Sequence, residues 1–172
     1  MLSVIVLAGA ETGSFSAESV ARTLASLVPA VVEGVVRDVT LVAPAGVAHL
    51  RELADHAGCA LAEAAAGDFL LAGLAAARGD LLFIVLAGRA PDPGFTVEVV
   101  DLFDKSSERA PRSALLRAEP DTFPQRLVPA LCPAEGLIAR RGDLSRNIST
   151  FADVRRKLIA PVALRCRLRR VG

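Results

Sequence analysis

Short apolar runs alternate with helix-like patterns from residue 3 to residue 103, and this alternation constrains the fold more than any other feature. Residues 3–7 form a continuous apolar run, typical of a strand that is buried on both faces. We expect three further strands at 38–43, 59–62 and 81–86, with helices at 16–28, 47–57, 67–78 and 93–103. This order predicts an α/β fold: a three-layer, doubly wound, mostly parallel sheet with right-handed crossovers, hence Rossmann-like.

The ends of two of these helices are marked by capping and breaking residues. Ser16 is a plausible N-cap of the first helix, and Pro29 lies where that helix is expected to stop. Gly58 follows the second helix at the position where a left-handed cap is common.

The second half of the chain follows a different pattern. It predicts strands at 113–118 and 136–140, a loop at 119–125 and an ambiguous segment at 127–131. Residues 151–158 and 162–171 are expected to be helical, separated at Pro161. Residues 105–112 are polar and are expected to form a surface loop.

Composition excludes several classes of protein. The chain has 172 residues, of which 52% are hydrophobic and 23% charged, which is typical of an ordered domain. A net charge of +1 gives no overall field for nucleic acid, so no nucleic-acid partner is expected. There is no Trp and no Tyr, which excludes a stacking platform built on those residues.

Positive charge is concentrated near the end of the sequence. Seven basic residues and no acid lie between Arg155 and Arg170. One interpretation is the solvated face of a basic helix, and the alternative is a helix that binds an anionic partner such as a phosphate or an anionic lipid.

The spacing of the cysteines predicts free thiols, hence a reducing environment, and no metal site. Cys59, Cys132 and Cys166 are widely spaced and make no metal-ligand spacing with His49 and His56, so free thiols are expected. The amino-terminal run is too short to cross a bilayer. We expect a cytoplasmic, bacterial protein that can form homo-oligomers.

Several segments together resemble family-2 glycosyltransferases of the nucleotide-diphospho-sugar transferase superfamily. The similarity is carried by residues 3–6, 20–27, 75–83, 91–95, 136–141 and 163–172. The resemblance implies a single glycosyltransferase A-like domain over residues 1–172, with a nucleotide-binding half at 1–104 and an acceptor-side half at 105–172. It also implies a nucleotide-sugar partner. The candidate nucleotide cleft then comprises Ala8, Glu11, Ala43, Leu86, Gly88 and Arg89.

The acidic motifs of that family are largely missing from this chain. The position of the metal-binding Asp-x-Asp motif falls on Leu86, Ala87 and Gly88, which have no side-chain oxygen for a hard divalent cation. The acid that grips the nucleoside corresponds to residues 43–46, and the catalytic base to 160–161, neither of which contains a carboxylate. Among the family's acidic positions in the cleft only Glu11 is retained, so neither a metal nor a cofactor is predicted.

Substitutes for the lost carboxylates and the metal are scarce. Asp80 and Asp92 are the nearest carboxylates, but one precedes the buried strand and the other lies beyond the turn. Without a metal, the charge of a diphosphate could be met by Arg89, Arg140 or Arg141, although each could equally be a solvated side chain beside a turn.

Two other functions remain open. The blank acidic positions favour a non-catalytic binding or scaffold member of the same superfamily. Residues 6–10 also resemble the Leu-Ala-Gly-Gly start of nucleotidyltransferases, although no basic residue follows at 11–15 to hold a triphosphate.

Overall fold

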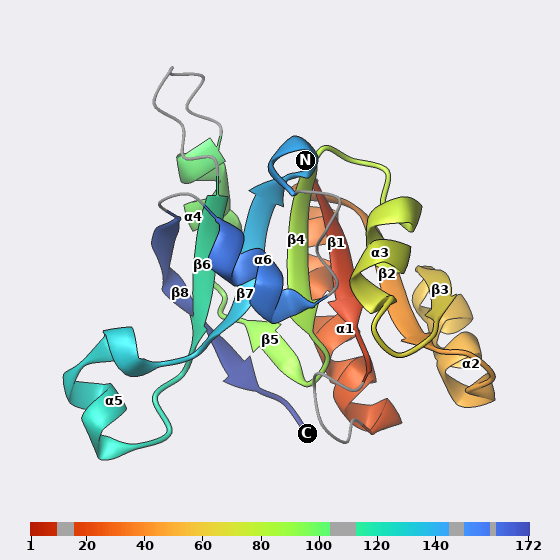
Figure 1. The fold of residues 1–172 in the computed structure, drawn as a ribbon, viewed down its shortest axis with the longest axis horizontal. Helices are drawn as coiled ribbons and strands as arrows, with labels where there is room; N and C mark the ends of the chain where they lie inside the picture. Colours follow the sequence, from red (N-terminus) through yellow and green to blue (C-terminus); the bar gives the residue numbers. More distant parts are fainter. Residues whose placement is uncertain (10–15, 104–112, 145–149, 159–160) are drawn as a thin grey trace.

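The fold is an α/β structure built on one eight-stranded sheet. The computed structural model describes residues 1–9, 16–103, 113–144, 150–158 and 161–172 (Figure 1). The sheet order is β3-β2-β1-β4-β7-β6-β8-β5. The strands are β1 (Leu2–Leu7), β2 (Val36–Pro44), β3 (Ala60–Ala64), β4 (Leu81–Leu86), β5 (Arg89–Pro91), β6 (Ser113–Ala118), β7 (Ala134–Arg140) and β8 (Val162–Arg170).

The first half of the sheet is parallel, as its sequence predicts. β1 is buried along its whole length and lies between β2 and β4, with Leu7 in register with Val42 on one side and Leu86 on the other. The carboxyl ends of the three strands therefore meet at one edge of the sheet. This is the edge outside which open α/β sheets bind ligands.

Helices cover both faces of the sheet and create two apolar cores. α1 (Ala17–Val32), α2 (Ala48–Ala57) and α4 (Phe95–Phe103) pack on one face, where Leu24, Leu50 and Phe95 join the core. α3 (Phe69–Ala76) and α6 (Phe151–Lys157) cover the other face (Figure 1). Three layers result, in agreement with the expected doubly wound architecture.

α1 begins where the sequence predicts but ends later than expected. Ser16 caps it, because its hydroxyl accepts a hydrogen bond from the Ser19 N–H at 3.1 Å. The prediction that Pro29 stops this helix is wrong, because α1 continues to Val32. Proline cannot donate to the carbonyl four residues earlier, which belongs to Ala25, and Ala25 is exposed, so water can solvate that carbonyl.

The second half of the sheet is mixed, with β7 and β5 antiparallel to their neighbours. β7 pairs antiparallel with β4 and with β6, and β6 pairs parallel with β8. Between β6 and β7, α5 (Phe123–Leu127) and the short 3-10 helix η2 (Pro129–Leu131) project as an arm in which neither helix buries a residue (Figure 1). A further 3-10 turn, η3 (Arg141–Asp143), follows β7. The expected loop at 105–112 lies outside the described residues.

The predicted helix at 162–171 is wrong, because Val162–Arg170 forms the strand β8. Leu164, Cys166 and Leu168 are buried, whereas Arg165 and Arg169, on alternate positions, are exposed. A period of two is the pattern of a strand with one covered face. The basic segment from Arg155 to Arg170 therefore comprises the last three residues of α6 and the strand β8, and is not a continuous basic helix.

β8 is held to α4 by one carboxylate. Glu98 on α4 accepts hydrogen bonds from the backbone N–H groups of Arg165 at 2.6 Å and Cys166 at 2.7 Å. Burial raises the pKa of the Glu98 carboxyl, but these hydrogen bonds and the charge of Arg165 outweigh it, so the net pKa is lowered. The ionised carboxylate consequently stabilises the folded state.

Replacing Glu98 with Gln should remove a stabilisation that depends on pH. Because the pKa of Glu98 is lower in the folded state than the ordinary value of 4.5, its contribution is complete above that pH and is lost as pH falls through the folded-state pKa. Thermal melts from pH 7 to pH 3 should show the melting temperatures of E98Q and wild type converging on acidification. The exposed Glu52 on α2 supplies the control variant E52Q, and a pH-independent gap for E98Q would contradict the assignment.

The cysteines are free thiols, as the sequence predicts. All three cysteines are free thiols, with Cys132 and Cys166 buried and Cys59 half-buried. Within the described ranges, every helix is too short or too polar to span a bilayer.

Candidate functional site

The candidate site lies where β1, β2 and β4 end together. Of the six residues predicted for the nucleotide cleft, Ala8 and Ala43 are fully buried and pack in the core beneath α1 and α2. Leu86, Gly88 and Arg89 are half-buried and follow one another at the end of β4. Glu11 lies outside the described residues.

A tight turn carries the chain from β4 into β5. Gly88 has a φ of +85°, a left-handed conformation that side chains disfavour, so glycine suits this position. Its N–H donates to the Thr23 hydroxyl at 2.9 Å, and its carbonyl accepts from the Val171 N–H at 3.0 Å. The turn is thereby fixed to α1 on one side and to the chain after β8 on the other.

Arg89, the next residue, is held by Glu135. The Arg89 Nη2 donates to Glu135 Oε1 at 2.8 Å, and Nε lies 2.6 Å from Oε2, an ion pair without full hydrogen-bond geometry. The two side chains are only 20% and 14% exposed. Glu135 is one residue before Gly136, the partner of Val85, so the antiparallel register places it beside the end of β4.

The electrostatics of this pair reflect its partial burial. Burial raises the pKa of Glu135, and the charges of Arg89 and Arg170 lower it while that of Asp121 raises it, leaving a net increase. Desolvation of the carboxylate is therefore not fully offset by its cationic neighbours. The pair lies in a region where charges interact more strongly than in bulk water.

A cavity of about 370 Å³ opens beside the end of β4. Leu86 forms one wall, and the start of α6 contributes Thr150, Phe151 and Ala152. Thr150 caps α6 by accepting a hydrogen bond from the Asp153 N–H at 3.1 Å. The cavity is therefore lined by apolar side chains together with the capping residue Thr150.

The described residues do not fit a divalent metal at this edge. Leu86, Ala87 and Gly88 offer no side-chain oxygen, and within the described ranges no three His, Cys, Asp or Glu side chains cluster as metal ligands. Glu135 is engaged by Arg89. Asp92 accepts a hydrogen bond from the Arg167 N–H at 3.0 Å, and Asp80 precedes β4 at the opposite end of that strand.

Arg140 and Arg141 do not belong to the site, so the prediction that they could meet a diphosphate is wrong. β7 runs antiparallel to β4, and Arg140 pairs with Leu81 at the start of β4, the opposite edge of the sheet. The Arg141 guanidinium donates to the carbonyls of Leu74, Ala77 and Gly79, with the Nη2 contact to Ala77 at 2.6 Å. Arg141 therefore satisfies carbonyls at the end of α3, where cations are favoured.

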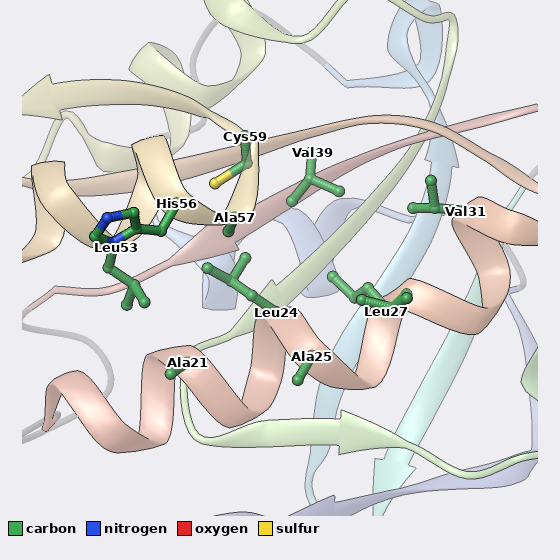
Figure 2. A pocket seen from close by; sticks show the side chains of 11 residues that line it. Ala21, Leu24, Ala25, Leu27, Val31, Val39, Leu53, His56, Ala57 and Cys59 are labelled. Carbon is green, nitrogen blue, oxygen red and sulfur yellow. The ribbon is translucent and has the colours of Figure 1, made fainter.

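A further hollow among the described residues is an apolar groove between α1 and α2 (Figure 2). It measures about 520 Å³, and apart from His56 and Cys59 its lining side chains are Ala, Val and Leu. Burial raises the pKa of the Cys59 thiol, which opposes formation of a reactive thiolate. The groove has no charged group to orient a phosphate, so the strand-end cavity remains the candidate site.

Glu135 and Thr150 were not predicted as site residues, although the sequence contains a partial signal for each. Glu135 immediately precedes the apolar run of a strand candidate, which places it at one end of that strand. The sequence does not indicate at which edge of the sheet that end lies. Thr150 precedes an expected helix, the position of an N-cap. The fold alone shows that both face the end of β4.

Replacing Thr23 with Val should loosen the turn that positions Arg89. Thr23 is fully buried, donates to the Ser19 carbonyl at 3.0 Å and accepts from Gly88, so Val leaves the Gly88 N–H without its acceptor. We expect T23V to lower the free energy of unfolding by about 1–3 kcal/mol. T23S keeps the hydroxyl and should lose only about 1 kcal/mol. Urea denaturation measures both, and a T23V as stable as wild type would contradict this role.

Comparison with known proteins finds similarity in structure only. No family model and no curated protein sequence matches this chain. Glucosyl-3-phosphoglycerate synthase from Mycobacterium tuberculosis, in complex with Mn²⁺, uridine diphosphate and phosphoglyceric acid, superposes with a TM-score of 0.58 at 18% identity, over 83% of this chain and 56% of that one. A mycobacterial protein gives 0.61 at 19% identity, over 83% and 54%.

The same synthase with phosphoglyceric acid alone gives a TM-score of 0.60 at 17% identity, over 95% of this chain and 69% of that one. These superpositions establish the glycosyltransferase A-like fold, and at identities of 17–19% they establish nothing finer. The chain spans only about half the length of the first two structures that it matches.

Proposed function

We propose that this chain is a glycosyltransferase-like domain that binds a nucleotide-diphospho-sugar at the carboxyl edge of β1, β2 and β4. The fold is shared with the glucosyl-3-phosphoglycerate synthase, some of whose structures contain uridine diphosphate or uridine-diphosphate-glucose. Because the identity to those structures is low, the extension to this chain rests on its own residues.

The observation that carries the proposal is the juxtaposition at the end of β4. A cavity of about 370 Å³, within the range of small-molecule pockets of about 300–1,000 Å³, is lined by Leu86 at the end of β4, and three residues further along the chain Glu135 fixes the guanidinium of Arg89. We place the sugar in the cavity, whose lining is apolar apart from Thr150. A diphosphate suits a fixed cation, and Arg89 supplies one at the same end of β4.

A non-catalytic binding module of the same fold is the second candidate. It is favoured by the absence of a metal-ligand cluster among the described residues, because a transferase of this fold ordinarily needs carboxylates for its metal and for a base. The two candidates share the ligand and differ in turnover. Release of nucleoside diphosphate from a bound nucleotide-sugar distinguishes them.

Calorimetric titration with a panel of nucleotides tests the shared claim. We expect one of UDP, GDP or ADP to bind with a dissociation constant of about 1–100 μM. The matching monophosphate should bind at least about tenfold more weakly, because it lacks the second phosphate that the guanidinium would contact. Failure of every diphosphate and of UDP-glucose and GDP-mannose to bind would contradict the proposal.

A pair of variants localises the site. Ala152 is exposed on α6 and lines the cavity, so A152F should fill the space and weaken nucleotide-sugar binding by about tenfold or more. Ala75 is exposed on α3 and does not line the cavity, so A75F is the matched control and should bind like wild type. Equal binding by both variants would place the ligand elsewhere.

A further inference from the structure

We propose that the guanidinium of Arg89, fixed by Glu135, is the cation that holds the diphosphate in this chain, in place of a divalent metal ion. This inference rests on the proposed binding of a nucleotide-sugar and names the group that recognises its charged part. The ligand class is any nucleoside diphosphate or its sugar ester.

The position of Arg89 is the first support. It follows directly on Leu86, Ala87 and Gly88, the residues that take the place of a metal motif at the end of β4. The Gly88 turn is anchored to Thr23 at 2.9 Å, so the backbone that carries Arg89 is fixed. The guanidinium meets Glu135, which the register of β7 places beside the end of β4, so its charge lies at this end of the strand.

The restraint of the side chain is the second support. Glu135 engages the Nε and Nη2 atoms, while no interaction of Nη1 is present among the described residues. A guanidinium has five N–H donors in one plane, so donors remain for a phosphate after Glu135 is satisfied. An arginine immobilised by a carboxylate is preorganised and loses less conformational entropy when it binds an anion.

The neighbouring charges explain why Arg89 is paired with a carboxylate. Arg89 lies directly opposite Arg170 in the antiparallel pairing of β5 and β8. Like charges at opposed positions destabilise a strand pair. Glu135 compensates one of the two arginines, and Asp121, whose charge also reaches Glu135, is an exposed residue next to the projecting arm.

The neutrality of the Arg89–Glu135 pair does not disqualify it. Two carboxylates with a bound divalent cation also have a formal charge of zero, and such sites bind diphosphates because the cation is presented outward. The same holds here if the free donors of Arg89 face the ligand. Arg170 adds a further positive charge that a two-carboxylate metal site lacks.

The described residues provide no competing metal site. Within those ranges no cluster of potential metal ligands exists, and the nearest carboxylates have other partners. Glu135 binds Arg89, and Asp92 accepts from the Arg167 N–H at 3.0 Å. A metal at the end of β4 would have to displace Arg89 from Glu135.

The experiment compares binding of UDP, GDP and ADP with EDTA and with Mn²⁺, in wild type and in two double variants. R89Q/E135Q removes both charges and retains amide groups that can hydrogen-bond to each other, which avoids leaving one charge buried alone. The control, R51Q/E63Q, neutralises the exposed pair of Arg51 and Glu63, whose N–O distance is 2.7 Å. Thermal melts verify that each variant is folded.

The proposal predicts that the nucleotide bound by wild type keeps its dissociation constant within about twofold in EDTA. R89Q/E135Q should bind it about 10- to 100-fold more weakly, the loss expected for hydrogen bonds to a charged group. R51Q/E63Q should bind like wild type. If R89Q/E135Q is unfolded, R89K replaces it, because Lys keeps the charge but not the planar fork, and should weaken binding about tenfold.

Each other outcome overturns the inference in a distinguishable way. Binding that requires Mn²⁺, or that is unchanged in R89Q/E135Q and R89K, overturns the role of Arg89 and leaves the proposed function standing. Absence of binding by wild type to every nucleotide, in EDTA and in Mn²⁺, overturns both.

Discussion

The antiparallel pairing of β7 with β4 decides which charges meet at the candidate site. Because Val85 pairs with Gly136, the preceding Glu135 reaches the end of β4 and engages Arg89 at 2.8 Å. The same pairing carries Arg140 to the opposite edge of the sheet, where it lies across from Leu81. The register of β7 on β4 therefore brings Glu135 to Arg89, and it places Arg140 and Arg141 at the opposite edge of the sheet from the candidate site.

The ion pair depends on the elements that position it. Arg89 follows the turn at Gly88, whose N–H donates to the buried Thr23 hydroxyl. The neighbouring strand β8 is bonded to α4 through Glu98. Breaking a partly buried ion pair costs more than the pair contributes, because one charge is left without a partner. A pair this costly to break fixes the geometry of the strand end whether or not a ligand is bound.

The parallel half of the fold could be predicted because its strands are short apolar runs that alternate with helical patterns, two of which have marked ends at Ser16 and Gly58. β1 is buried on both faces, so its continuous apolar run is an unambiguous signal. β8 was mispredicted because arginines at 165, 167 and 169 suggested a basic helix, although the buried residues between them alternate with a period of two. The prediction from Pro29 failed for a different reason: on the exposed face of a helix, water can replace a missing backbone hydrogen bond.

The site was predictable only in part. The end of β4 and Arg89 follow from the linear pattern, since they are adjacent in the chain. Glu135 does not, because it lies 46 residues away and reaches Arg89 only through an antiparallel register that no local signal specifies. Arg141 was a candidate for binding a diphosphate because of its charge, but its guanidinium satisfies carbonyls at the end of α3.

The most direct test of the account is a crystal structure of the protein grown with saturating UDP or GDP and Mn²⁺, with anomalous data collected at the manganese edge. We expect a diphosphate in contact with the Arg89 guanidinium beside the end of β4, Glu135 still paired with Arg89, and no anomalous peak coordinated by protein oxygen atoms there. A manganese ion held at that position by carboxylates of this chain, with Arg89 turned away from the diphosphate, would contradict it.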